Sequence, residues 1–154
     1  MKNGSTFILR ATIILIAVIV IGICLFALPV GLLSDLTGYY QPIILGLYVT
    51  AIPFFYAIYQ AFKLLDFIDT NKAFSLVSIQ ALKRIKYCAY IICTLFAFGM
   101  PYVFYVADAD DAPGIAALGF VIVGASFVIG TFAGVAQRLF KNAVDIKAEN
   151  DLTV

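Results

Sequence analysis

The sequence predicts an all-α polytopic membrane protein, with four transmembrane helices that form two antiparallel hairpins and extend as helices on the cytoplasmic side. Three observations support this fold class. Of the 154 residues, 64% are apolar and only 12% are charged, whereas soluble domains average about 25% charged residues. Four long stretches carry no charge at all. Every basic residue lies on the same side of these stretches if each of them crosses a membrane once.

The four stretches without Asp, Glu, Lys or Arg are the predicted membrane spans. They cover residues 11–33, 42–62, 87–106 and 113–136, with 23, 21, 20 and 24 residues. A helix rises about 1.5 Å per residue and the hydrocarbon layer is about 30 Å thick, so about 20 apolar residues are enough to cross it. Residues 1–154 are therefore expected to form a single four-helix transmembrane domain.

The first span follows Lys2 and Arg10, as the apolar region of a secretory signal peptide would. However, its 23 uncharged residues exceed the roughly 7–15 residues of such a region, and no small-residue cleavage site follows it. We interpret this span as a retained signal anchor.

The second span contains Pro53 near its middle. Proline removes one helical hydrogen bond and frees the carbonyl of Val49, so we expect a kink, with Thr50 placed to satisfy the backbone. A structural bend is the preferred interpretation, and a functional hinge is the alternative. The polar residues of this span that could line a transport path are Tyr48, Thr50, Tyr56, Tyr59 and Gln60.

Residues 63–86 form the predicted cytoplasmic loop, which is too apolar for a flexible linker. We expect the second helix to continue beyond the membrane and to break at Asp69-Thr70-Asn71. Ser75 is suited to cap the next helix. That helix can then run without a break through Lys83 and Arg84 into the third span.

The third span has tyrosines near both of its ends. Tyr87 and Tyr90 stand at its start, and Tyr102 and Tyr105 stand close to its end. A tyrosine ring is apolar while its hydroxyl is polar, so this residue prefers the boundary between membrane and water. The four tyrosines therefore mark the inner and outer interfaces.

The fourth span carries a helix-packing stripe of small residues. Ser126, Gly130 and Gly134 follow at steps of four and therefore share one helix face, and small residues allow membrane helices to approach closely. We expect packing within the molecule, with a homo-oligomer through the fourth helix as the alternative. Leucine at Gly130 or Gly134 should destabilise the protein more than leucine at Gly119, which lies off the stripe.

The cytoplasmic tail, residues 137–154, continues the fourth helix with apolar residues on one side. These are Leu139, Phe140, Ala143 and Val144. The helical pattern stops at Asn150, so we expect the end of the chain to be an extended recognition strand that a partner can bind. This strand comprises Asn150, Asp151, Leu152, Thr153 and Val154.

The positions of the charges predict the orientation. All ten basic residues lie in the N-terminus, the 63–86 loop or the 137–154 tail, so the positive-inside rule places both termini in the cytoplasm. The two outer loops, 34–41 and 107–112, are short enough to make each hairpin tight. These loops hold only acidic charges, namely Asp35, Asp108, Asp110 and Asp111.

Several function classes lack the residues they need. The chain has no histidine, so the common zinc ligands and the usual general base are missing. No span holds an acidic or basic residue, although proton-coupled carriers usually need one. The net charge of +1 argues against direct binding of nucleic acid. We therefore expect no catalysis, no cofactor and no metal site.

Three segments resemble the YoaS-like family of small bacterial membrane proteins, a domain of unknown function. They are Asp69-Thr70-Asn71-Lys72-Ala73-Phe74-Ser75, Ala81-Leu82-Lys83-Arg84-Ile85 and the ending from Asn142 to Val154. The resemblance covers essentially the whole chain and implies no known activity, cofactor or catalytic residue. It implies a bacterial cytoplasmic membrane. Because members are often encoded beside a small helix-turn-helix DNA-binding protein, it also implies that regulator as a cytoplasmic partner.

Two hypotheses for the function follow. In the first, the loop and the tail form a cytoplasmic platform around Phe74, with Lys83 and Arg84 at its rim and Asn150–Val154 as its terminal segment. This platform would dock the small regulator, while the spans hold it at the lipid bilayer. In the alternative, the protein is a small-solute transporter or a channel component.

Overall fold

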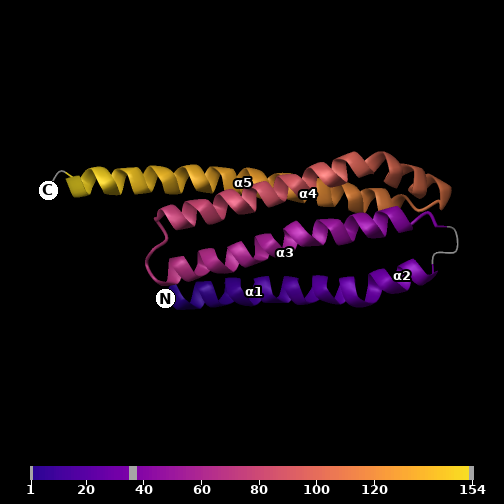
Figure 1. Ribbon diagram of the computed structural model, residues 1–154, viewed down its shortest axis with the longest axis horizontal. Helices are drawn as coiled ribbons and strands as arrows, with labels where there is room; N and C mark the ends of the chain where they lie inside the picture. Colours follow the sequence, from indigo (N-terminus) through magenta and orange to yellow (C-terminus); the bar gives the residue numbers. More distant parts are fainter. Residues whose placement is uncertain (1, 35–37, 153–154) are drawn as a thin grey trace.

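Four long helical segments that run in alternating directions form the protein in a computed structural model, which describes residues 2–34 and 38–152 (Figure 1). Each segment is long and apolar enough to cross a membrane. Within the two described ranges no strand is present. The prediction of an all-α protein with four spans is therefore confirmed.

The first helical segment extends beyond the predicted span on its N-terminal side and is interrupted once. It consists of helix α1 (Lys2–Gly22), the π-helix η1 (Ile23–Ala27) and helix α2 (Leu28–Ser34). In η1 the N–H of Leu28 donates to the carbonyl of Ile23, five residues back. The same spacing pairs the Cys24 carbonyl with residue 29, which is a proline without an N–H. Pro29 therefore leaves the carbonyl of Cys24 without a backbone donor.

Helix α3 (Gln41–Asp69) ends at the predicted residue. Asn71, in the turn that follows, adopts a φ of 60°, a left-handed conformation that asparagine tolerates better than most residues. Pro53 lies inside α3. The hydroxyl of Thr50 donates to the carbonyl of Leu47 at 2.9 Å. It therefore does not bond the Val49 carbonyl that Pro53 frees, although we had expected Thr50 to satisfy the backbone there.

Helix α4 (Leu76–Ala109) is capped by Ser75, as predicted. The Ser75 side chain accepts a hydrogen bond from the N–H of Ser78. Ser78 is fully buried, and its hydroxyl donates to the carbonyl of Lys72 at 3.0 Å. These bonds fix the turn between α3 and α4 to the first turn of α4.

Helix α5 (Pro113–Leu152) packs along α4 through glycines. A Cβ atom at Gly130 would lie 2.9 Å from the ring of Tyr90, and one at Gly134 would lie 3.2 Å from Cδ of Lys86. Gly119 is also buried, and a Cβ there would lie 2.7 Å from Sδ of Met100. Our expectation that Gly119 lies away from the packed face is therefore wrong, because the packed face of α5 extends beyond the stripe formed by Ser126, Gly130 and Gly134.

The structure of the tail also differs from our expectation. Asn150, Asp151 and Leu152 continue α5 as helix and do not form an extended strand, while Thr153 and Val154 lie outside the described residues. The segment after Ala136 contains neither glycine nor proline, so nothing interrupts the helical hydrogen bonds. The tail is thus a helical rod that projects beyond the other helices (Figure 1).

Candidate functional site

We call the end of the bundle with the α3–α4 turn and Arg10 the basic end, and the opposite end, with Asp108 and Asp110, the acidic end. Two features could bind another molecule. One is a groove at the basic end, and the other is a cavity between the four spans.

The basic-end groove has a volume of about 800 Å³. Helix α1, the end of α3, the α3–α4 turn and one residue of the tail form its walls. The lining residues are Ser5, Thr6, Leu9, Leu65, Ile68, Asn71, Lys72, Ala73, Phe74, Ser75 and Lys147. The groove therefore brings together segments from both termini and from the predicted cytoplasmic loop.

An aromatic contact joins the α3–α4 turn to the tail. The rings of Phe74 and Phe140 meet edge to face, with their centroids 5.2 Å apart. Beyond this contact, Leu139 and Ile146 are 61% and 66% exposed. These two residues lie seven positions apart with Ala143 between them, so they form one apolar stripe on the helix. We call Leu139, Ala143 and Ile146 the tail stripe.

Lys83 and Arg84, which we expected at the rim of the platform, are exposed on α4 and do not line the groove. The ammonium group of Lys83 lies 6.0 Å from the centre of the Tyr87 ring, and that of Lys86 lies 5.2 Å from it. This arrangement of basic and aromatic side chains suits the headgroup region of a membrane. The structure therefore separates the basic cluster from the groove.

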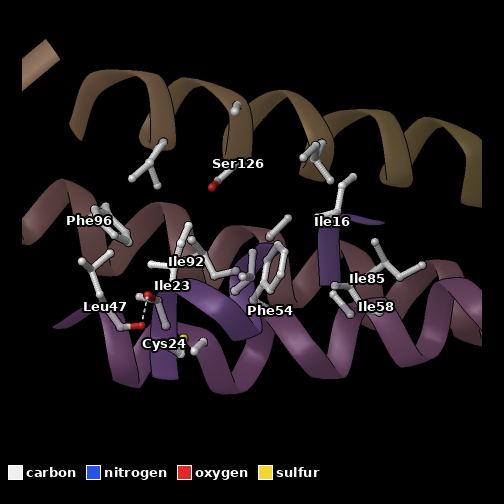
Figure 2. A pocket seen from close by; sticks show the side chains of 18 of the residues that line it. Ile16, Ile23, Cys24, Leu47, Phe54, Ile58, Ile85, Ile92, Phe96 and Ser126 are labelled. Carbon is white, nitrogen blue, oxygen red and sulfur yellow. Dashed lines mark hydrogen bonds between the residues drawn. The ribbon is translucent and has the colours of Figure 1, made fainter. Parts of the chain in front are cut away.

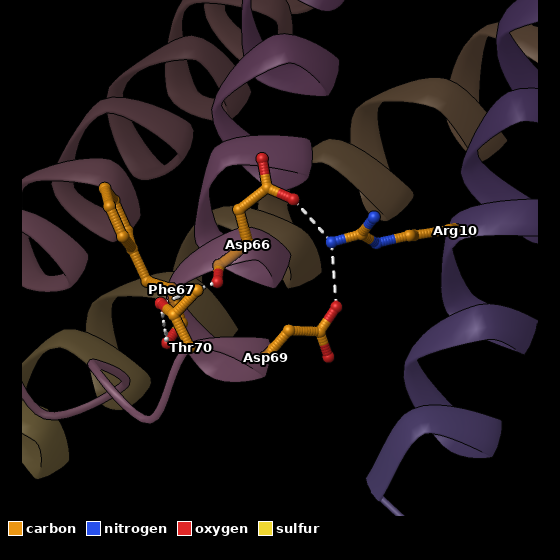
Figure 3. Close-up of polar contacts among 5 residues, drawn as sticks. All are labelled: Arg10, Asp66, Phe67, Asp69 and Thr70. Carbon is orange, nitrogen blue, oxygen red and sulfur yellow. Dashed lines mark hydrogen bonds and ion pairs between the residues drawn. The ribbon is translucent and has the colours of Figure 1, made fainter.

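An ionic latch holds the first span to α3 at the basic end. The guanidinium of Arg10 pairs with Asp66 and, at 2.8 Å, with Asp69, which lie three residues apart on one face of α3 (Figure 3). These ion pairs were not predicted from the sequence. The sequence features that could have indicated them are a single Arg just before an apolar stretch and two acidic residues three positions apart on a predicted helix.

A hydrogen bond joins the first span to α3 a second time, inside the apolar stretch of both segments. The hydroxyl of Tyr48 donates to the carbonyl of Cys24 at 2.8 Å. That carbonyl is the acceptor that Pro29 leaves without a backbone donor. In lipid no water is present to satisfy such a group, so this bond compensates for the π-helix.

The central cavity extends along the first span from Ile13 to Leu28, past the Tyr48–Cys24 bond. Its volume is about 570 Å³, and Figure 2 shows side chains from all four spans around it. The lining residues are Ile13, Ile16, Val20, Ile23, Cys24, Leu28, Leu47, Thr50, Ala51, Phe54, Ala57, Ile58, Ala61, Ile85, Ala89, Ile92, Phe96, Ile122, Ala125, Ser126 and Ile129. No charged side chain is among them.

The cavity arises because the first span packs on α3 and makes few contacts with α4 or α5. The cavity is partly open, so apolar molecules of the surrounding bilayer can reach it.

Ser126 turns its hydroxyl into the cavity (Figure 2). It makes no hydrogen bond with any residue in the described ranges, whereas Thr12, Thr94 and Thr131 each donate to the carbonyl four residues earlier. Ser126 is thus separate from the glycine contacts with α4, although the sequence groups it with Gly130 and Gly134.

The polar residues of α3 that we considered for a transport path do not lie together. Thr50 lines the central cavity, and Tyr48 bonds the first span. Tyr56 and Tyr59 are 44% and 60% exposed. Gln60 is buried and lines none of the cavities described.

At the acidic end, tyrosines connect the two hairpins. The hydroxyl of Tyr40 donates to the carboxylate of Asp110, and that of Tyr102 donates to the carbonyl of Tyr39 at 2.8 Å. Asp35 lies outside the described residues. Within the described ranges, no three His, Cys, Asp or Glu side chains come together as metal ligands.

Comparisons with known proteins agree with the resemblance seen in the sequence. A family model described as "Protein of unknown function (DUF2975)" matches residues 30–154. The chain is also 48% identical, over 160 residues, to the uncharacterized membrane protein YoaS of Bacillus subtilis (strain 168), and the match covers both chains completely. No solved structure matches the chain.

Proposed function

The chain belongs to this family of membrane proteins of unknown function, and we propose that it docks a small cytoplasmic helix-turn-helix regulator at its basic end. The resemblance to the YoaS-like family implies this partner, because members are often encoded beside such a regulator. In this proposal the protein is a non-enzymatic anchor. It holds the regulator at the bilayer and does not itself contact nucleic acid.

The projecting tail is the observation that carries the proposal. Helix α5 continues beyond the bundle, and its tail stripe leaves Leu139 and Ile146 mostly exposed. An apolar stripe at helical spacing is the feature by which an amphipathic helix binds a groove on a partner. The Phe74–Phe140 contact fixes the base of this helix to the α3–α4 turn.

The basic-end groove supports the same proposal. It lies next to the tail, since Lys147 lines it, and it offers apolar walls together with the polar groups of Ser5 and Asn71. The surface of a helical regulator presents both apolar and polar side chains, so it can contact both parts of the groove. The transporter alternative has less support, because the polar residues of α3 do not line one continuous path.

Docking of a cytoplasmic regulator requires the basic end to face the cytoplasm, as the positive-inside rule predicts. Single cysteines at Lys72 and Asp108, in a background where the three native cysteines are serine, test this orientation. In intact cells an impermeant thiol reagent should label Asp108→Cys and leave Lys72→Cys unmodified. The opposite pattern would place the groove outside and end the docking proposal.

Copurification tests the docking itself. The full-length chain is produced together with a small helix-turn-helix protein of the kind encoded beside family members, and both are purified in detergent through a tag on the membrane protein. We expect capture of the regulator near one per chain. The double variant Leu139→Glu and Ile146→Glu should reduce capture at least tenfold, because the charges disrupt the tail stripe.

Ala148→Glu is the matched control, since Ala148 is exposed on the opposite side of the same helix. It should capture the regulator as well as the wild type does. Deletion of residues 150–154 tests whether the terminal segment itself contributes to binding of the regulator. Equal capture by the wild type and the double variant, or no capture by the wild type, would contradict the proposed function.

A further inference from the structure

We propose that the central cavity binds one acyl chain of a membrane phospholipid. This inference does not rest on the proposed docking function, because it concerns the membrane part of the molecule. It follows from the position, the lining and the volume of the cavity.

The position of the cavity makes it accessible to lipid. The first span and α5 line it from opposite sides without packing on each other. Ile16, Ile23 and Ile129 line the cavity and are still 43%, 45% and 54% exposed. The cavity therefore opens sideways, at a depth where the neighbouring molecules are the hydrocarbon chains of the bilayer.

The lining excludes water as a stable occupant. A buried water molecule needs about two to four polar partners. The hydroxyl of Ser126 has no hydrogen-bond partner among the described residues, whereas that of Thr50 already donates to the Leu47 carbonyl. Almost all other lining atoms belong to aliphatic or aromatic side chains. An occupant without hydrogen-bonding needs of its own fits this surface best.

The volume fits one chain. An apolar cavity of about 150 Å³ holds a benzene molecule, and the present cavity of about 570 Å³ is almost four times larger. At the same density it has room for a chain of roughly twenty carbons. This capacity suits a single acyl chain, which can enter from the bilayer through the lateral opening while its headgroup stays at the membrane surface.

Photo-crosslinking in the bilayer tests the proposal with the unchanged protein. The full chain is reconstituted into vesicles that contain a phosphatidylglycerol with a diazirine at the end of one acyl chain. After illumination, peptide mass spectrometry should find adducts on cavity residues of both the first span and α5, such as Ile16 and Ser126. Adducts confined to outward-facing residues, such as Phe98 and Phe132, would overturn the proposal.

Retention of lipid after purification provides the second measurement. The wild type should keep about one phospholipid per chain after detergent exchange. Ala125→Phe, which adds a ring to the cavity lining and narrows the space for a chain, should lose at least four fifths of it. Ala117→Phe makes the same change at an exposed position of α5 that lines no described cavity, and it should keep the lipid. Equal retention by both variants, or a stoichiometric apolar molecule other than phospholipid, would overturn the proposal.

Discussion

The two halves of the bundle are held together by different means. Helices α4 and α5 approach closely because glycines on α5 accept the side chains of Met100 and Tyr90. The first span carries large aliphatic residues where it faces the rest of the bundle, and it is fixed to α3 by the Arg10 latch and the Tyr48–Cys24 bond. A cavity remains beside it.

The comparison shows what close packing requires in a membrane. An apolar side chain gains no hydrophobic free energy when it moves from lipid into a protein interface. Membrane helices therefore associate through close packing and polar bonds. Small residues supply the close contact between α4 and α5. In the first span a glycine contact of this kind is given only by Gly31, where a Cβ atom would lie 3.6 Å from Ile44, among the described residues. The span therefore depends more on specific polar groups, and it should be the part of the molecule that moves most readily.

The largest effect should come from overpacking the tight half. Gly130→Leu would force a side chain against the ring of Tyr90, and we expect a loss of about 2–3 kcal/mol, since overpacking typically costs about 1–3 kcal/mol. Thermal unfolding in detergent measures it. Gly124→Leu is the control, because nothing lies within 4 Å of a Cβ atom there. Equal melting temperatures for the two variants would show that α4 and α5 are not closely packed.

The second effect concerns the polar bond in the loose half. Tyr48→Phe would leave the Cys24 carbonyl without a donor, and a buried unsatisfied polar group costs about 1–3 kcal/mol. We therefore expect a loss of about 1–2 kcal/mol in the same thermal measurement. Tyr59→Phe removes a hydroxyl from an exposed tyrosine of the same helix and should change little. If Tyr48→Phe left the melting temperature unchanged, the Cys24 carbonyl would have another hydrogen-bond donor within the π-helix.

The smallest effect should come from the latch. The Arg10 side chain is 36% exposed, and those of Asp66 and Asp69 are 64% and 28% exposed. Exposed ion pairs contribute about 0–1 kcal/mol, so Arg10→Gln should lower the stability by at most about 1 kcal/mol. The loss should shrink at high salt. Arg84→Gln, at an exposed position of α4, is the control, and a salt-independent loss would argue against an ionic role.

Local sequence signals were enough to predict the spans and several helix ends. The Asp69-Thr70-Asn71 break and the Ser75 cap follow from turn and capping chemistry, which act over a few residues. The helical tail was mispredicted because the change of composition at Asn150 suggested an end that no glycine or proline enforces.

The features that depend on the pairing of helices were not predictable from the sequence. Arg10 meets Asp66 and Asp69 only because of the register between the first span and α3. Pro29 was visible, but its consequence, an orphan carbonyl at Cys24, depends on where the π-helix forms. The central cavity results from the shapes of side chains on four helices. The spacing of apolar residues in the sequence does not show how these shapes fit together.

The contrast between the rigid α4–α5 pair and the loosely attached first span can be measured directly by double electron–electron resonance in lipid nanodiscs. Spin labels at Ile8 and Tyr59 report on the first span and α3, and labels at Ile91 and Phe132 report on α4 and α5; all four side chains are at least half exposed. We expect a clearly broader distance distribution for the first pair, which broadens further in Tyr48→Phe. Equal widths for the two pairs, unchanged by that substitution, would contradict this account of the fold.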